Sequence, residues 1–260
     1  MAIPKIIHYC WFGGSDLPED VQECIASWKK YCPDYQIIRW DESNYDYNQY
    51  RFSREAYESK KWAFVSDVAR LDVVFHYGGI YLDTDVELVK PLDCLLSEPA
   101  YMGFEQGRSV ATGLGFGAEK GNQLIKENLD AYQTMSFVKD NGELNLIACP
   151  RITTEILERH GLVRKDEMQK LNGLTVFPTS YFAPMILADG SAELKPETIS
   201  IHHFAASWTT EQEKQEMQRR RKIYTLFGRN ALRVYDGMNL LRTKGFRAFW
   251  HRCMEILKQS

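Results

Sequence analysis

The chain has 260 residues, of which 44% are hydrophobic and 13% aromatic, so it can bury a large core and is not a disordered chain. The net charge of -3 argues against an extended nucleic-acid track, which needs a basic surface. No run approaches the ~20 apolar residues of a membrane span, the first residues lack the pattern of a secretion signal, and the 6 cysteines form no Cys-x-x-Cys pair. We therefore expect free thiols and a cytoplasmic protein.

Charge is unevenly distributed along the chain. From residue 214 to the end there are 12 Lys and Arg against 3 Asp and Glu, whereas residues 1–213 carry 20 against 32. An acidic body with a basic tail indicates two different surfaces. We predict an α/β domain over residues 1–210 and a basic amphipathic helical tail over residues 211–260.

The first third of the chain alternates strand-like and helix-like segments. Residues 3–12 are β-branched and aromatic, residues 18–31 place apolar side chains on one helical face, and residues 35–40 are strand-like again. This β-α-β order predicts an α/β fold that opens like a nucleotide-binding half-sheet. The later pattern predicts helices over 54–60, 62–77, 122–135 and from 150, strands over 101–105, 114–118, 174–177 and 199–204, and an aromatic loop over 178–184.

Trp11 lies at the end of the first predicted strand, at the edge where open α/β sheets bind ligands. Such a tryptophan can stack on a nucleobase, a contact worth ~1–3 kcal/mol. It can equally be a core tryptophan, and composition alone favours neither interpretation.

The helix predicted over residues 62–77 is mostly apolar but contains charged residues, among them Asp67 and Arg70. Asp67 and Arg70 are three positions apart, about one helical turn, so they share a face. They could form an ordinary ion pair, or they could hold a polar ligand such as a sugar hydroxyl or a phosphate. The apolar surroundings favour a ligand, because buried charges need partners.

Residues 78–85, which read GGIYLDTD, follow this helix directly. We interpret them as a glycine turn and a short strand that carries Asp83 and Asp85 on one face, since side chains two apart on a strand point the same way. Two close carboxylates repel each other unless a cation lies between them, and oxygen ligands suit manganese or magnesium. The alternative is a polar turn after an edge strand.

A second group of candidate metal ligands lies near the end of the strand predicted over residues 199–204. His202 and His203 are adjacent there, and a neutral imidazole binds manganese-like ions well. One of the two could complete a metal site begun by Asp85. The alternative is a pair of surface histidines.

The basic tail mixes Lys and Arg with aromatic residues. This composition suits an anionic membrane surface, and the alternative is a helical pair that caps the core. We predict peripheral association with the cytoplasmic face of the inner membrane, and no nucleic-acid partner.

Four stretches taken together resemble the family 32 glycosyltransferases. They are residues 8–14 (HYCWFGG), 66–70 (SDVAR), 78–85 (GGIYLDTD) and 202–208 (HHFAASW). This family includes the yeast-type initiating mannosyltransferase and many bacterial polysaccharide enzymes, and the catalytic domains of large glucosylating toxins are more distant relatives. The resemblance covers residues 3–210 and implies a GT-A fold, a Rossmann-like mixed sheet that binds nucleotide sugars and is flanked by helices.

The resemblance implies a site for the nucleotide-sugar donor. Trp11 matches the tryptophan that stacks on the donor base, and Asn44 matches a base-contacting asparagine. Asp67 and Arg70 match the pair that grips the donor sugar. Tyr81 matches a residue at the nucleotide ribose.

The same resemblance implies a metal site. Asp85 matches the direct metal ligand, and Asp83 matches a residue at the donor and the metal. His203 falls where related retaining enzymes carry a third metal-site residue, with His202 as the alternative for that role.

Ser207 and Trp208 match a loop that closes over the pyrophosphate. Together these residues predict a retaining glycosyltransferase that uses Mn²⁺ or Mg²⁺ and a nucleoside-diphosphate sugar, UDP-galactose first. The predicted acceptor is a lipid-linked saccharide in the synthesis of a surface polysaccharide.

Three alternatives remain beside this function. A protein acceptor is less favoured because the toxins' long helical insertions are absent. A hydrolase with Asp83 and Asp85 as an acid–base pair is disfavoured, since such carboxylates flank a bond ~5 Å or more apart. The third alternative is an inactive module that binds nucleotide sugars or glycans.

Overall fold

The structure is a computed structural model, and it describes residues 2–106, 108–186, 191–204, 219, 223, 231, 234, 235 and 237–239. Contacts divide the chain into two compact units, Met1–Met185 with Ala192–Trp208, and Ile186–Ser191 with Thr209–Ser260. The described residues after 208 are helical. Most of the predicted basic tail lies outside the described residues. Among the helices that the structure describes, none is both long and apolar enough to cross a bilayer.

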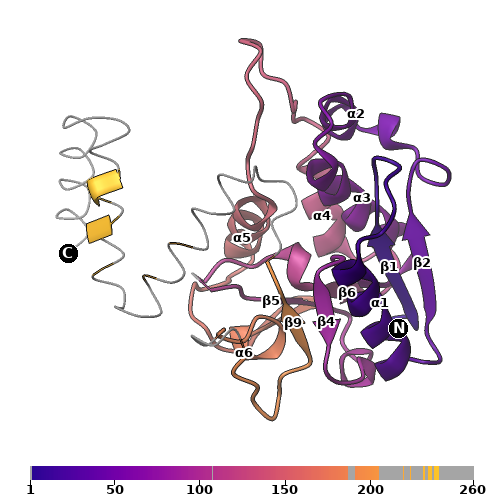
Figure 1. Ribbon diagram of the computed structural model, residues 1–260, viewed down its shortest axis with the longest axis vertical. Helices are drawn as coiled ribbons and strands as arrows, with labels where there is room; N and C mark the ends of the chain where they lie inside the picture. Colours follow the sequence, from indigo (N-terminus) through magenta and orange to yellow (C-terminus); the bar gives the residue numbers. More distant parts are fainter. Residues whose placement is uncertain are drawn as a thin grey trace. The chain divides into compact units, whose positions relative to one another are not determined.

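The chain begins with the predicted β-α-β unit (Figure 1). Strand β1 (Ile6–Cys10) and strand β2 (Gln36–Trp40) pair in parallel, and helix α1 (Glu19–Tyr31) connects them. Helix α1 buries Val21, Ile25 and Trp28, side chains three or four apart, on the face turned toward the protein. The β-α-β prediction is therefore confirmed.

The main sheet has seven strands in the order β2-β1-β3-β6-β5-β8-β7. Strands β1, β2 and β3 run parallel, β6 is antiparallel to both of its neighbours, and β5 and β8 are parallel. The remaining strands are β3 (Gly79–Tyr81), β5 (Ala100–Gly103), β6 (Phe116–Ala118), β7 (Gln169–Leu171) and β8 (Leu174–Phe177). The predicted α/β class, with a mixed sheet flanked by helices, is confirmed.

Side chains alternate between two hydrophobic cores, one on each face of the sheet. Ile80 and Tyr101 belong to the core that includes α1, whereas Tyr81 and Met102, their neighbours in sequence, belong to the other core. That second core also contains side chains of helices α2 (Arg51–Glu58), α3 (Trp62–Tyr77), α4 (Gln123–Asp130) and α5 (Cys149–Arg159). The shorter helices are η1 (Tyr47–Gln49), η2 (Asp93–Leu95), η3 (Thr112–Leu114) and α6 (Thr179–Phe182).

A small second sheet joins two distant parts of the sequence. Strand β4 (Val86–Leu88) pairs antiparallel with β9 (Ser200–His202), and Val86 lies opposite His202 (Figure 1). This pairing brings residues 200–202 next to the segment that contains Asp83 and Asp85.

The prediction that Asp83 and Asp85 stand on a strand is wrong. Strand β3 ends at Tyr81, and Val86 N–H donates to the Asp83 carbonyl at 3.0 Å, which closes a turn between β3 and β4. The chain turns here because it leaves the main sheet and joins β9 instead. The two carboxylates are therefore gathered by a turn and not by strand alternation.

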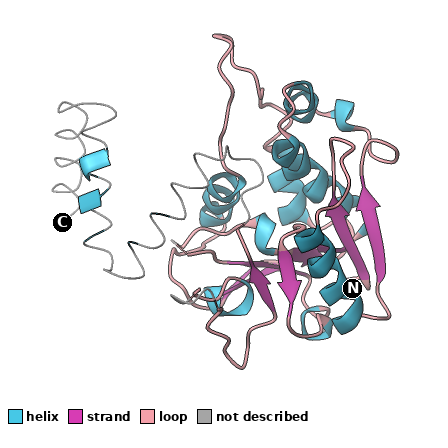
Figure 2. Ribbon diagram, viewed as in Figure 1, coloured by secondary structure: helices cyan, strands magenta, loops and turns pink. Residues whose placement is uncertain are grey.

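Three other segments differ from the sequence expectations. The aromatic loop expected over 178–184 contains helix α6, strand β7 was not predicted, and α4 ends at Asp130 although the pattern continued to 135. Residues 131–148 contain no helix or regular strand, and most of this stretch is drawn as loop (Figure 2). This connection leads into the first residue of α5.

Candidate functional site

Helix α3 carries charged side chains into the protein interior, among them Asp67 and Arg70. Residues 64–74 of this helix are all buried, and Asp67 and Arg70 are only 8% and 3% exposed. Because a charge without a partner is costly in the interior, these two side chains must be paired with each other or with nearby groups.

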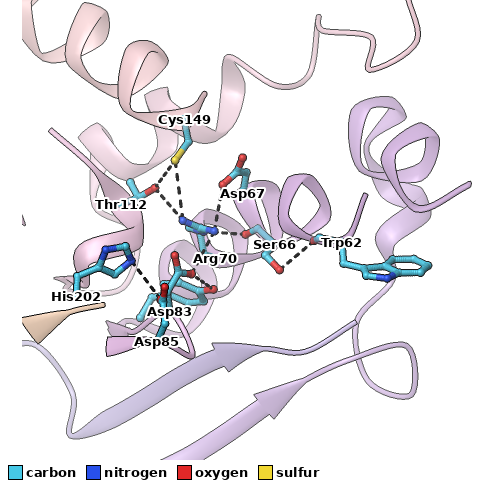
Figure 3. Close-up of polar contacts among 10 residues, drawn as sticks. Trp62, Ser66, Asp67, Arg70, Asp83, Asp85, Thr112, Cys149 and His202 are labelled. Atoms are coloured by element: carbon cyan, nitrogen blue, oxygen red, sulfur yellow. Dashed lines mark hydrogen bonds and ion pairs between the residues drawn. The ribbon is translucent and has the colours of Figure 1, made fainter. Parts of the chain in front are cut away.

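The Arg70 guanidinium lies at the centre of a group of polar side chains (Figure 3). Its Nη2 lies 3.1 Å from Asp67 Oδ1 and 3.3 Å from Asp83 Oδ1, and its Nε donates to the Ser66 carbonyl at 3.0 Å. The guanidinium carbon also stands 5.0 Å from the centre of the Tyr81 ring, a cation–π contact. Arg70 thus links the predicted sugar-binding residue Asp67 to the first aspartate of the Asp-x-Asp turn.

Tyr81 fixes the Asp83 carboxylate. It is buried in strand β3, and its hydroxyl donates to Asp83 Oδ1 at 2.8 Å. Tyr81 therefore orients Asp83 in this structure, and its predicted contact with a nucleotide ribose stays a prediction. The same oxygen of Asp83 faces both Tyr81 and Arg70, so the rotation of this carboxylate is restrained.

Asp83, Asp85 and His202 form a group that fits a divalent cation. One ligand atom from each lies within 4.8 Å of the other two. His202 Nε2 is 3.2 Å from Asp85 Oδ1, and its Nδ1 is buried without a hydrogen-bond partner among the described residues. Two carboxylates and an imidazole suit Mn²⁺ and related ions, and Nε2, the ring nitrogen that faces Asp85, is the atom placed to bind such an ion.

His203, named as the third metal residue in the prediction, lies elsewhere. Its Nε2 is 3.0 Å from Glu87 Oε2, while its backbone N–H donates to the Asp85 carbonyl. Successive side chains at a strand end point to opposite sides, so only one of the two histidines can face the Asp-x-Asp turn. That histidine is His202, the alternative left open by the sequence.

Burial perturbs the carboxyl groups of this site. Burial raises the pKa of Asp67 to about 6 against the opposing Arg70 charge, and burial together with the Asp85 charge raises the pKa of Asp83. Burial disfavours a charged His202, but the Asp85 and Asp83 carboxylates outweigh it and raise the pKa of that imidazole. The region therefore attracts positive charge, as a cation site requires.

Three residues at the site were not predicted from the sequence. Thr112, from helix η3, and Cys149, the first residue of α5, lie beside Arg70 (Figure 3). Burial raises the pKa of the Glu105 carboxyl to about 7, and the nearby His202 opposes this shift. None of the three stands in a recognisable motif, and no sequence signal could have placed them here.

The other predicted donor residues make local contacts. The Trp11 indole N–H donates to the Ser15 carbonyl at 2.8 Å. The Asn44 amide donates to the Arg39 carbonyl and its oxygen accepts from Asp41 N–H, so this side chain stabilises a turn. Base recognition by Trp11 and Asn44 stays a prediction. Ser207 and Trp208 lie outside the described residues.

Comparison with known proteins gives matches to glycosyltransferases. The chain is 31% identical over 111 residues to inositol phosphoceramide mannosyltransferase 1 of Schizosaccharomyces pombe, which covers 38% of this chain and 33% of that protein. It is 35% identical over 104 residues to mannosyl phosphorylinositol ceramide synthase SUR1 of Saccharomyces cerevisiae, 38% of this chain and 27% of that protein. The chain thus spans about a third of the length of these curated relatives.

Solved structures with a similar chain path were also found. The PaToxG glycosyltransferase aligns with a TM-score of 0.47 at 21% identity over 61% of this chain and 70% of its own. A glycosyltransferase involved in glycosylation of the major capsid of PBCV-1 aligns with a TM-score of 0.43 at 14% identity over 83% of this chain and 99% of its own.

The family match falls on the part of the chain that contains most of the site. The model of the glycosyltransferase sugar-binding region containing a DXD motif matches residues 18–102. This range includes helix α3 with Asp67 and Arg70, and the turn with Asp83 and Asp85. Residues 18–102 of this chain are therefore similar to the DXD-containing glycosyltransferase sugar-binding regions that the sequence motifs indicated.

Proposed function

We propose that this protein is a metal-dependent retaining glycosyltransferase that transfers a hexose from a nucleoside-diphosphate sugar to a saccharide acceptor. One observation carries the proposal. A buried arginine links a sugar-binding aspartate to an Asp-Asp-His group, inside the region that matches the DXD family. A nucleotide sugar needs both kinds of contact, because its hydroxyls and its diphosphate must be held together.

The proposed cofactor is Mn²⁺ or Mg²⁺, held by Asp83, Asp85 and His202. When bound, such an ion acts as a Lewis acid that stabilises the charge on the departing diphosphate. The Asp83 carboxylate is restrained, because Tyr81 and Arg70 both contact its Oδ1. His202 brings a nitrogen ligand, which favours Mn²⁺ over Mg²⁺.

The proposed donor contacts come from helix α3. Arg70 carries a permanent charge and presents N–H groups in a fixed plane, which suits a hydroxyl or phosphate oxygen. Asp67 accepts hydrogen bonds when ionised, and Arg70 at 3.1 Å favours that form. Because both side chains are held on one helix turn, they can orient a sugar without a large loss of side-chain entropy.

The identity of the hexose is the finer part of the proposal. UDP-galactose is the donor first expected from the sequence, whereas both named relatives transfer mannose according to their names. Mannose is therefore added beside galactose and glucose as a candidate. The sugars differ at single hydroxyls, and one such contact discriminates by only ~1–3 kcal/mol.

A lipid-linked acceptor is proposed on similar grounds. The names of both yeast relatives describe mannose transfer to a ceramide lipid, so regions similar to this one occur in enzymes named for glycolipid synthesis. We place the reaction at the cytoplasmic face of the membrane in surface polysaccharide synthesis, with the basic tail as the docking segment. Liposome binding by the full chain and by a chain ending at residue 213 tests this placement, and equal binding by the two would contradict it.

A thermal-shift panel tests the donor and the cation together. A ligand that binds only the native state raises the unfolding midpoint by mass action. We expect a rise with UDP-galactose, UDP-glucose or GDP-mannose that requires Mn²⁺, followed by Mn²⁺-dependent release of the nucleoside diphosphate. A rise without any turnover would identify a binding module, and no rise with any nucleotide sugar would refute the proposal.

A further inference from the structure

We propose that Thr112 and Cys149 are positioning residues that set the hexose preference of the site, an inference that rests on the proposed function. Both lie beyond the region that matches the family, in η3 and at the start of α5. They contact Nη1 of Arg70, whereas the ion pairs use Nη2, and Figure 3 shows all of these side chains around the guanidinium.

The contacts join Arg70, Thr112 and Cys149 to one another in a triangle. Arg70 Nη1 lies 3.5 Å from Thr112 Oγ1 and 4.0 Å from Cys149 Sγ, and the Thr112 hydroxyl donates to the Cys149 sulfur at 3.5 Å. Asp67 pairs with the other terminal nitrogen of Arg70, Nη2, at 3.1 Å. Arg70 therefore contacts a neutral hydroxyl–thiol bridge formed by Thr112 and Cys149.

The two terminal nitrogens of Arg70 make contacts of different strength. Nη2 makes two ion pairs, whereas the contacts of Nη1 within the described part of the chain are the two long ones to a hydroxyl and a thiol. Charge-assisted hydrogen bonds of an N–H to an oxygen are normally about 2.7–2.9 Å long, so Nη1 is a weakly satisfied donor in a buried place. An oxygen of a bound sugar would bond to it more strongly than Thr112 or Cys149 does.

An incoming sugar hydroxyl must therefore compete with Thr112 and Cys149 for the Nη1 donor of Arg70. Thr112 is 1% exposed and held by η3, so it cannot move far when a ligand enters. The backbone of the same η3 segment is tight against the site, because a Cβ at Gly113 would lie 2.5 Å from Asp83 Oδ2 and 3.4 Å from Arg70 Nη1. Epimeric hexoses present a hydroxyl at different positions, so a rigid hydroxyl here favours one epimer over another.

The experiment compares two epimeric donors that share a nucleotide, with Mn²⁺ present. Dissociation constants are measured by calorimetry for UDP-galactose, UDP-glucose and UDP, or for GDP-mannose, GDP-glucose and GDP if the wild type binds guanosine. We expect Thr112→Val to change the ratio between the epimers by about 3- to 10-fold, with the affinity for the diphosphate alone within about 2-fold. Thr112→Ser, which keeps the hydroxyl, should restore the wild-type ratio.

Cys149→Ala tests the other half of the bridge, and because this residue is only half-buried the variant should fold. It should shift the ratio by about 2- to 4-fold, since a thiol bonds more weakly than a hydroxyl. The matched controls are Thr175→Val, which removes a buried hydroxyl bonded to Glu98, and Cys94→Ala at an exposed thiol. Neither control should change the ratio.

The inference would be overturned if a variant lost equal affinity for both epimers and for the free diphosphate. It would also be overturned if Thr112→Val and Cys149→Ala both left the affinity ratio between the epimers unchanged. Either result would leave the transferase function intact. If Thr112→Val does not fold, the ratio in Cys149→Ala decides alone. If the wild type binds no nucleotide sugar with Mn²⁺, the proposed function fails and the inference falls with it. The two failures are therefore distinguishable.

Discussion

The surroundings of His8, which is buried, and of His202, which is partly buried, differ in a way that separates a structural histidine from a candidate ligand. His8, on β1, has both ring nitrogens occupied, with Nε2 2.8 Å from the Gly78 carbonyl and Nδ1 3.1 Å from Trp40 Nε1. His202, at the end of β9, has one nitrogen at Asp85, and its Nδ1 has no hydrogen-bond partner within the described part of the chain.

The number of hydrogen-bond partners of the ring nitrogens, and not the burial of the ring, therefore distinguishes a structural histidine from a candidate ligand. His8 can only be the tautomer that donates from Nε2, because the Trp40 indole must donate to Nδ1. Burial lowers the pKa of His8, so this ring stays neutral and ties β2 to the turn before β3. Carboxylates raise the pKa of His202 instead, and a nitrogen that attracts a proton in this way also attracts a cation.

The strongest test of the His202 region is Asp85→Asn. The substitution keeps the shape of the side chain but removes the charge that faces His202. We expect transfer to fall by at least about 100-fold, as when one preorganised electrostatic group is removed from an active site. Rates with Mn²⁺ titration measure it, and Asp140→Asn on an exposed loop is the control. Unchanged transfer with unchanged metal dependence would remove Asp85 from the site.

The adjacent histidines should respond differently to truncation. His202→Ala removes a proposed ligand, so we expect Mn²⁺ affinity and transfer to fall by about 10- to 100-fold. His203→Ala removes only the contact with Glu87 and should change either quantity by less than about 3-fold. Electron paramagnetic resonance of bound Mn²⁺ measures the affinity. The reverse order of effects would reinstate His203.

His8 should affect stability and leave the cation site unchanged. His8→Leu leaves a buried indole N–H and a buried carbonyl without partners, which costs about 2–4 kcal/mol of unfolding free energy. Urea unfolding measures this loss, while Mn²⁺ affinity of the folded protein should stay within about 3-fold. A loss of Mn²⁺ affinity without a loss of stability would show that His8 is not purely structural.

The smallest expected effect concerns Asp67 and pH. Burial raises its pKa in the folded protein to about 6 from 3.8, so the folded state holds this proton more tightly than the unfolded state. Wild-type stability should therefore fall, relative to Asp67→Asn, as pH rises from about 4 to above 6, by about 2 kcal/mol. Urea unfolding at pH 4.5 and 7.5 compares the two. An opposite slope would show that the Arg70 ion pair outweighs burial.

Local patterns in the sequence predicted the part of the fold and of the site that lies within short segments. The apolar spacing in residues 62–77 placed Asp67 and Arg70 on one helical face, and α3 has those bounds. The Asp-x-Asp spacing identified two neighbouring carboxylates, although their closeness comes from a turn that the strand-like residues before Asp83 concealed. Strand β7 was missed because its sequence, QKL, has no alternation of polar and β-branched residues.

Long-range contacts could not be predicted in the same way. The choice between His202 and His203 depends on the β4–β9 register, which pairs Val86 with His202. A shift of that register by one residue would exchange the two side chains. Thr112 and Cys149 reach Arg70 only through the packing of η3 and α5, and each is an ordinary residue in its own segment.

The β4–β9 ladder also has a consequence for the folding kinetics. Asp85 and His202 are 117 positions apart, so the three candidate ligands come together only after this long loop has closed, a step that is entropically costly and slow. A cation that requires all three side chains would then bind after the rate-limiting step. Mn²⁺ should slow unfolding while leaving the refolding rate unchanged, and during synthesis the chain would acquire its metal only once residue 202 has left the ribosome.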